Sequence, residues 1–428
     1  MSQLTAESLR FTYLVLFILE FLCLRLLTVL NLRALAAGRQ PPELKMQIGA
    51  DILARSRLYA RANSRLSLAD STLKAGVLLF LLVSGGLGRL ETISRLPSLP
   101  GGLHSLLMLF ALYLLLGLIS LPFNVWRQFG IEARFGFNTM KPRLFLLDLF
   151  RQVCLAALLG SPLLLALLRL MDRSGDAWWL YAFLLLAGVQ IALMVLVPLV
   201  IAPLFNTFSP LPDGELKKRI RAFMAARGMR LSGIFVMDGS RRSKHANAYF
   251  GGMGRTRRIV LFDTLLEILP DEQIVAVLAH ELGHQKLRHL LKALGLALTG
   301  LLASLWLAGQ ALRFPVLFSA FGFSAPGPGA LLVLALFYSQ PLFFFLKPLA
   351  SNLSRRRELA ADRFALDAGI SPAVLSAALL KLSIDNLSVL SPHKLYSLYH
   401  NTHPPLSERL RAIAATAEKP PPISSPAA

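Results

Sequence analysis

The sequence has 428 residues, of which 55% are hydrophobic and only 16% are charged, and its formal net charge is +21. A mean hydropathy of +0.57 is too high for an ordinary soluble domain, so the composition indicates a polytopic membrane protein. The only two cysteines, Cys23 and Cys154, lie in apolar segments, which excludes a disulfide framework and a cysteine-based zinc site.

Seven segments approach or reach the length of about 17 to 25 apolar residues that a helix needs to cross the hydrocarbon core of a bilayer. In chain order they are residues 11–32, 73–90, 103–125, 152–168, 178–203, 290–312 and 329–349. The first segment is too long for a removable signal peptide and lacks a small-residue cleavage site. The chain is therefore predicted to be mainly α-helical and to cross the membrane about seven times.

The basic residues are distributed unevenly between the two sides of the membrane. With seven crossings, 35 of the 45 Lys and Arg residues fall on the side that holds loops 33–72, 126–151 and 204–289 and the C-terminal tail. The positive-inside rule predicts that this side is cytoplasmic and that the N-terminus lies outside. Topology and contact with anionic lipids account for the net charge, and the sequence has no recognised nucleic-acid-binding motif. We therefore expect no nucleic-acid partner.

The loops divide the chain into membrane and soluble parts. Residues 1–203 are predicted to form an N-terminal membrane region with five spans, and residues 290–349 hold spans six and seven. Two cytoplasmic insertions, 204–289 and 350–416, are predicted to form the two parts of one domain. Residues 417–428 are rich in proline and serine and are expected to be disordered.

The first cytoplasmic insertion contains the segment PDEQIVAVLAHELGH, in which Pro270 and Asp271 mark a helix start. On such a helix His280 and His284 share a face, so both imidazoles can reach one metal ion, with Glu281 beside them. In this arrangement zinc lowers the pKa of a bound water, and the glutamate accepts its proton as the water attacks a carbonyl. The motif indicates peptide-bond hydrolysis, although a match this short also occurs by chance.

A catalytic zinc site needs a third protein ligand and one open position. The segment SNLSRRRELAADRFALDAG supplies Glu358 and Asp362 on a helix that is expected to begin just after span seven. Glu358 is predicted to complete the ligand set, and Asp362 to hydrogen-bond a ligand histidine and fix its tautomer. Alternatively, the two acids and the three arginines before them form a solvated, salt-bridged helix face. The pairing with the histidine motif across one membrane hairpin favours the ligand interpretation.

Several colinear segments make the sequence resemble the integral-membrane zinc endopeptidases of the type I CaaX prenyl protease kind. In the order of the family these segments are RFGFNTMKPRLFLLDLFR, PLFNTFSPLPDGELKKRI, MDGSRRSKHANAYFGGMGRTRRIVLFDTLLE, AHELGH, SRRRELAAD and THPPLSERL. They cover roughly residues 125–410. The resemblance implies seven helices in a ring around a water-filled chamber, closed at the cytoplasmic end by a zincin-type metalloprotease domain with a small β edge.

The resemblance also implies roles for individual residues. One Zn²⁺ per chain would be bound by His280, His284 and Glu358, with Glu281 as the catalytic base. Asp362 would hydrogen-bond the ring nitrogen of a ligand histidine that faces away from the metal. In the family the Asn-Ala-Tyr stretch lines the active-site cleft as an edge strand, to which an extended peptide substrate can add. This stretch corresponds here to Asn247, Ala248 and Tyr249, although a loop-packing role remains open for Tyr249.

The segment THPPLSERL places His403 and Arg409 at family positions near the metal, where a donor can stabilise the oxyanion that develops on the carbonyl. An ordinary turn at His403 and an orienting salt bridge at Arg409 remain the alternatives. His289, His393 and His400 match no ligand position and are expected to lie at the membrane interface.

The sequence thus predicts a monomeric membrane-embedded zinc metalloendopeptidase with CaaX-type C-terminal processing activity, acting on peptide or protein substrates that include lipidated ones. A heat-shock-type membrane quality-control protease shares the zinc motif but typically has fewer spans. A non-enzymatic metal-binding membrane protein would be expected to hold its ligands within the spans. The Leu-, Ala- and Arg-rich composition looks bacterial, so the expected location is the bacterial inner membrane, with the active site facing the cytoplasm and the natural substrate left open.

Overall fold

The computed structural model of the chain describes residues 5–38, 41, 44, 47–95, 101–252 and 254–417. Within these residues seven helical segments are long and apolar enough to cross a membrane, which confirms the predicted number of spans. In chain order they are α1 (Ala6–Ala37), α3 (Ala50–Val83), α5 (Gly101–Val125) with the π-helical η1 (Trp126–Glu132), α6 (Pro142–Leu155) joined through η2 (Ala156–Gly160) to α7 (Ser161–Arg173), α8 (Trp178–Leu196) joined through η4 (Val197–Ile201) to α9 (Ala202–Phe205), α13 (His289–Ala311) and α15 (Pro328–Asp367).

The predicted bounds of the second span are wrong. The helix α3 begins at Ala50 and ends at Val83, and Gly85, with a φ of 71°, separates it from the short α4 (Gly86–Ser94). The basic residues before residue 73 suggested a loop, but the helix α3 includes them. One of them, Arg55, donates a 2.6 Å hydrogen bond to the carbonyl oxygen of Phe135. Hydropathy alone could not show that these arginines have partners on a neighbouring element. The predicted disordered tail lies outside the described residues, except for Ala417.

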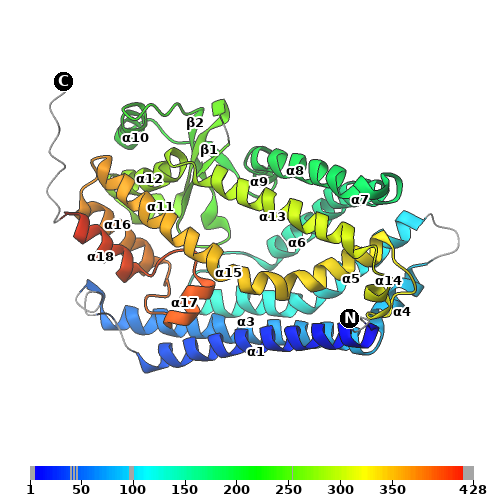
Figure 1. Cartoon of the computed structure of the whole chain (residues 1–428). Helices are drawn as coiled ribbons and strands as arrows, with labels where there is room; N and C mark the ends of the chain where they lie inside the picture. The colour runs from blue at the N-terminus through cyan, green and yellow to red at the C-terminus, as the bar shows by residue number, and fades with distance from the viewer. Residues whose placement is uncertain are drawn as a thin grey trace, which may run out of the picture.

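The seventh span and the segment that carries Glu358 form one helix rather than two. The 40-residue α15 continues past residue 349, where the span was predicted to end, with Pro341 and Pro348 inside it. At about 1.5 Å per residue its length is about 60 Å, roughly twice the thickness of the hydrocarbon core. It is therefore long enough to extend beyond the hydrocarbon core, and Figure 1 draws it as the long yellow and orange helix.

Consecutive spans pack against one another: α1 with α3, α3 with α5, α5 with α7, α7 with α8, α8 with α13 and α13 with α15. The last span, α15, also packs against α1, α5 and α7. In Figure 1 α1 and α3 lie side by side along one edge, with α8 and α13 on the opposite side. Two cavities of about 700 Å³ and 840 Å³ lie between the helices, and Lys74 lines both. The fold is thus the mainly helical, multi-pass architecture that the sequence predicted.

The core of the membrane bundle contains large apolar side chains from both ends of the chain. Tyr13 of α1 and Phe337 of α15 are buried in it with Phe318 of the short helix α14 (Pro315–Ser319), and the Tyr13 hydroxyl donates a 3.3 Å hydrogen bond to the carbonyl oxygen of Phe337. Burial of such side chains contributes roughly 1.5 to 3 kcal/mol each. This packing fixes α15 against α1, and with it the direction in which α15 leaves the membrane.

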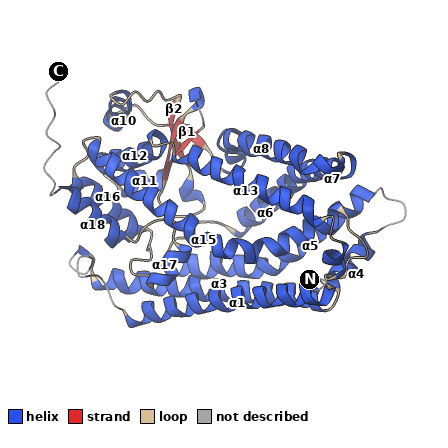
Figure 2. Ribbon diagram, viewed as in Figure 1, coloured by secondary structure: helices blue, strands red, loops and turns tan. Residues whose placement is uncertain are grey.

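The soluble part combines a four-stranded sheet with helices on both sides of α12, shown in red and blue in Figure 2. Its strands are β1 (Phe208–Pro210), β2 (Gly233–Met237), β3 (Ala248–Gly251) and β4 (Arg258–Phe262). Its helices are α10 (Glu215–Ala225), α11 (Asp263–Ile268), α12 (Asp271–Lys286), α16 (Pro372–Asp385), α17 (Lys394–His400) and α18 (Leu406–Ala417). The strand order is β1-β2-β4-β3, with β2 and β4 parallel and the other two pairs antiparallel.

The strand β3 lies at one edge of the sheet, because β4 is its only partner among the described strands. It packs against α12, which also contacts α15 and α16. Ile259 and Leu261 of β4 are fully buried with Leu278 and Leu282 of α12. The small β edge expected from the sequence is therefore present, and it lies beside the helix with the histidine motif.

Candidate metal centre

The helix α12 presents different faces to the sheet and to α15. Asp271 and Glu272 occupy its first turn, where negative charge stabilises a helix start. Leu278 and Leu282 lie in the hydrophobic core with the sheet, so the four-residue spacing leaves His280 and His284 on another face. That face contacts the end of α15.

Gly283, between the two histidines, allows α12 and α15 to approach closely. A Cβ atom at this position would lie 3.0 Å from the Cα and 3.1 Å from the carbonyl oxygen of Ala361, and 3.2 Å from the Cβ of Phe364. Because two of these neighbours are backbone atoms of a helix, a side chain here would push the helices apart. The glycine of the motif thus sets the distance between the histidines and Glu358.

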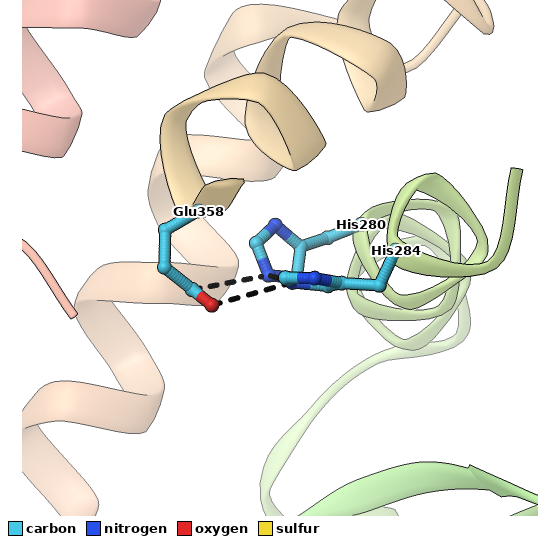
Figure 3. Close-up of side chains that lie close together, drawn as sticks. All are labelled: His280, His284 and Glu358. Carbon is cyan, nitrogen blue, oxygen red and sulfur yellow. Dashed lines mark hydrogen bonds and ion pairs between the residues drawn. The ribbon is translucent and has the colours of Figure 1, made fainter. Parts of the chain in front are cut away.

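Three predicted ligand residues converge at the contact between these helices (Figure 3). The Nε2 atom of His280 lies 3.5 Å from Oε2 of Glu358, and Nε2 of His284 lies 3.3 Å from Oε1 of Glu358. The two Nε2 atoms are 3.2 Å apart, and one ligand atom from each residue lies within 4.8 Å of the other two. His280 and Glu358 are buried and His284 is half-buried.

Asp362, one turn after Glu358, contacts His280 on the ring nitrogen that points away from Glu358. Its Oδ1 atom accepts a 2.7 Å hydrogen bond from Nδ1 of His280, and Arg409 donates to both carboxylate oxygens at 2.8 Å and 2.5 Å. Burial lowers the pKa of His280, but the hydrogen bonds with Asp362 and Glu358 outweigh it and raise the pKa to about 9. The predicted contact of Asp362 with a ligand histidine is present, and Arg409 forms the orienting salt bridge that was its alternative.

Glu281 and His403 complete the immediate surroundings of the cluster. Glu281 is half-buried, and burial raises the pKa of its carboxyl group, against the lowering effect of the charges of His280 and His284. His403 follows α17 and places its Nδ1 atom 2.7 Å from Oε2 of Glu358, while 67% of its side chain stays exposed. His403 therefore lies at the open rim of the cluster rather than in a remote turn.

His289 is a neighbour of the cluster that the sequence did not indicate. It is buried at the first residue of span six, and its Nδ1 atom lies 3.0 Å from Nδ1 of His284. Arg288, with a φ of 55°, makes the sharp turn that brings the first residue of α13 back against α12. Only the position of a histidine five residues after His284 could have suggested this contact.

The predicted substrate residues lie at the sheet edge. Asn247 is exposed directly before β3, Ala248 is buried as its first residue, and Tyr249 is half-buried. The Tyr249 ring packs edge-on against Phe262 at 6.4 Å between centroids, and burial raises the pKa of its hydroxyl. The strand lies beside α12 and the Tyr249 ring packs against Phe262 of β4, so both the substrate role and the packing role of Tyr249 stay predictions.

The loop before β3 is anchored to the membrane helices by His245. Its ring stacks on Phe137 with 4.1 Å between centroids, and its Nε2 atom lies 3.3 Å from Oε2 of Glu132. Its Nδ1 atom lies 3.2 Å from Oδ1 of Asn386, whose side chain also bonds the backbone of Ala246 in both directions. This network gives His245 a structural role and fixes where β3 begins.

The cluster has the properties that a metal centre requires. Two imidazole nitrogens and one carboxylate converge from two helices, and both histidines have a partner for their other ring nitrogen. Among the described residues, none gives the buried Oε2 atom of Glu358 a well-aligned hydrogen bond, although His403 is in ion-pair contact with it. A buried carboxylate oxygen without an aligned donor is suited to bind a cation.

The chain is similar to known proteins over nearly its whole length. A family profile described as "CAAX prenyl protease N-terminal, five membrane helices" matches residues 31–207, and the profile of peptidase family M48 matches residues 210–417. A CAAX prenyl protease 1 homolog of Oryza sativa is 35% identical over 89% of this chain and 91% of its own length. CAAX prenyl protease 1 of Saccharomyces cerevisiae is 33% identical over 92% of each chain.

A solved structure agrees with these matches. The crystal structure of S. mikatae Ste24p superposes with a TM-score of 0.89 at 31% sequence identity, covering 95% of this chain and 99% of that chain. The agreement includes both the helical membrane region and the soluble part, since the aligned share exceeds either alone. The chain is therefore a multi-pass integral membrane protein that belongs to the metallopeptidase family M48.

Proposed function

We propose that this protein is a membrane-embedded zinc endopeptidase that processes the C-termini of prenylated CaaX proteins. The observation that carries the proposal is the convergence of His280, His284 and Glu358 within 4.8 Å, with Glu281 next to the first ligand. Two imidazoles, one carboxylate and an open fourth position form the ligand set of many catalytic zinc sites. We propose one zinc ion per chain.

The roles of the surrounding residues follow from their contacts. Bound zinc would supply a Lewis acid that activates water and polarises the scissile carbonyl. Glu281 would accept the proton of the attacking water, since its half-buried carboxyl group directly follows the first proposed ligand in the chain. His403 is exposed and can donate to the developing oxyanion. Arg409 donates hydrogen bonds from Nε and Nη2 to Asp362, which bonds His280, so we assign Arg409 to positioning His280.

The free edge of β3 supports an extended peptide as the substrate. Because β3 lies beside α12, a peptide that adds to it as a strand would run past the metal centre, with Asn247, Ala248 and Tyr249 as neighbours. Residues 204–289 and 350–416 would then act as the two parts of one catalytic domain. The relatives named CAAX prenyl protease 1 suggest prenylated proteins as the substrate class.

The basic side of the protein supports a cytoplasmic active site. Most Lys and Arg residues lie on the side that holds α12, which the positive-inside rule makes cytoplasmic. A monomer in a bacterial inner membrane stays a prediction from the sequence.

The full chain, purified in detergent, is expected to cut a farnesylated CaaX peptide after the modified cysteine and to release the last three residues. Mass spectrometry of the products measures the cut. A zinc chelator should abolish cleavage and added Zn²⁺ should restore it. The same peptide without farnesyl should show a kcat/KM at least about tenfold lower, since a lipid chain adds binding energy with each buried methylene. Chelator-resistant cleavage, or no cut by the zinc-loaded protein, would contradict the proposal.

Replacing His289 by alanine is expected to lower the affinity for zinc by about 10- to 100-fold, because His284 loses the acceptor that orients its ring. Competition with a chromophoric chelator measures this affinity without any reference to activity. His289→Asn keeps an acceptor and should retain most of the affinity, whereas His393→Ala removes a histidine outside the cluster and should leave it unchanged. An unaltered affinity in His289→Ala would show that the contact has no positioning role.

A further inference from the structure

A second feature of the joint between α12 and α13 is a cavity of about 390 Å³, which we call the joint pocket. Arg257, Lys286 and Arg288 line it, and none of the described residues that line it is acidic. His284 also lines the joint pocket, so anything bound there lies next to a proposed metal ligand.

The positive charges of the joint pocket are not neutralised by the protein. Within the part of the chain that the structure describes, none of the three basic residues forms an ion pair with a carboxylate. The guanidinium group of Arg257 makes a weak contact, in which its Nη1 atom lies 3.7 Å from Sδ of Met229. By contrast, Arg409 is neutralised by Asp362. Unpaired cations around a concave surface create a positive potential that attracts anions.

The backbone at Arg288 has a conformation that glycine adopts with less strain. Its φ of 55° lies in the left-handed region, where a Cβ atom is unfavourable. The turn leaves the exposed side chains of Lys286 and Arg288 at the joint pocket. Replacing Arg288 by glycine would thus remove a charge from the joint pocket while preserving the turn.

The joint pocket lies where the chain enters the membrane. The sixth span begins at His289, and Leu290 and Leu291, each 48% exposed, line the same cavity. Basic residues directly before a span lie at the level of the lipid head groups, while apolar residues of its first turn face the acyl chains. One cavity therefore offers cations and exposed leucines at the bilayer surface.

We propose that the joint pocket binds an anionic phospholipid. Arg257, Lys286 and Arg288 hold its phosphate, and its acyl chains run along Leu290 and Leu291. The combination of three unpaired cations with two exposed leucines at a span boundary fits a lipid better than a soluble anion, because a soluble anion has no apolar part that could contact Leu290 and Leu291. The proposal is independent of the proposed substrate, because it concerns binding alone.

The test compares binding of palmitoyl-oleoyl phosphatidylglycerol and phosphatidylcholine to the delipidated full chain by native mass spectrometry. Wild type is expected to prefer phosphatidylglycerol. Lys286→Gln with Arg288→Gly should weaken its binding by about 25-fold, since each basic residue near an anionic surface contributes about fivefold. The control, Lys218→Gln with Arg219→Gln, removes two cations from α10 and should bind like wild type. Thermal unfolding verifies the fold, and the single variant Lys286→Gln serves if the double variant is unfolded.

Three outcomes would overturn the proposal. One is equal binding of phosphatidylglycerol by wild type and the joint-pocket variant, and a second is an equal loss in the α10 control. The third is binding of soluble glycerol phosphate as tight as that of phosphatidylglycerol, which would assign the cavity to a free phosphate. A further arm measures KM for peptides with a free or amidated C-terminus. A variant that raises KM only for the free acid, with lipid binding intact, would assign the cavity to the substrate carboxylate instead.

Discussion

Glu281→Gln is expected to lower kcat for peptide hydrolysis by about 10² to 10⁴-fold while zinc stays bound. The substitution preserves the shape of the side chain and removes the group that can accept a proton from water. Zinc affinity should not change, because the ligand atoms come from His280, His284 and Glu358. Product analysis of the farnesylated peptide measures the rate, and metal analysis of the purified variant measures zinc content.

The matched control is Glu272→Gln in the first turn of the same helix. Glu272 is largely exposed, and among the described residues its ion-pair contact is a single one with Arg219 at 4.0 Å, so its loss should leave kcat within about twofold. Retained cleavage in zinc-loaded Glu281→Gln would remove Glu281 from the mechanism. Loss of zinc together with activity would instead assign Glu281 a role in holding the metal.

Much of the candidate site could be predicted because its spacing is local. The four-residue repeat of His280 and His284 places both on one helix face, and the same repeat places Glu358 and Asp362 on another. The number of spans between the two segments brings them to the same side of the membrane. The structure places these four residues in contact, as that reasoning expected.

The remaining features depend on contacts that no periodicity encodes. The role of His289 depends on the left-handed turn at Arg288, and a sequence does not show that a non-glycine residue adopts it. The choice between the oxyanion and salt-bridge roles of Arg409 depended on whether the loop after α17 brings it to Asp362. The predicted start of the second span missed the first part of α3, because a hydropathy pattern does not distinguish arginines in a loop from arginines in a helix outside the bilayer.

The second large effect is expected at Glu358, where Glu358→Gln should lower the affinity for zinc by at least about 10³-fold. The loss of an outer hydrogen bond to a ligand already costs 10- to 100-fold, and a direct ligand that also supplies negative charge costs more. Glu358 is buried, and His280, His284 and His403 all lie within 3.5 Å of its carboxylate oxygens. Activity at limiting zinc should fall in parallel. Chelator competition measures the affinity.

Asp367→Asn is the matched control, because Asp367 lies on the same helix with 66% of its side chain exposed. Its ion-pair contact, within the part of the chain that the structure describes, is one of 3.8 Å with Arg363. Its removal changes the charge of α15 equally but leaves the cluster intact, so zinc affinity should stay within about twofold of wild type. Equal affinities in Glu358→Gln and wild type would exclude Glu358 as a ligand. The result separates the two interpretations of the acidic segment, since a solvated helix face would respond alike to both substitutions, whereas a ligand responds to one.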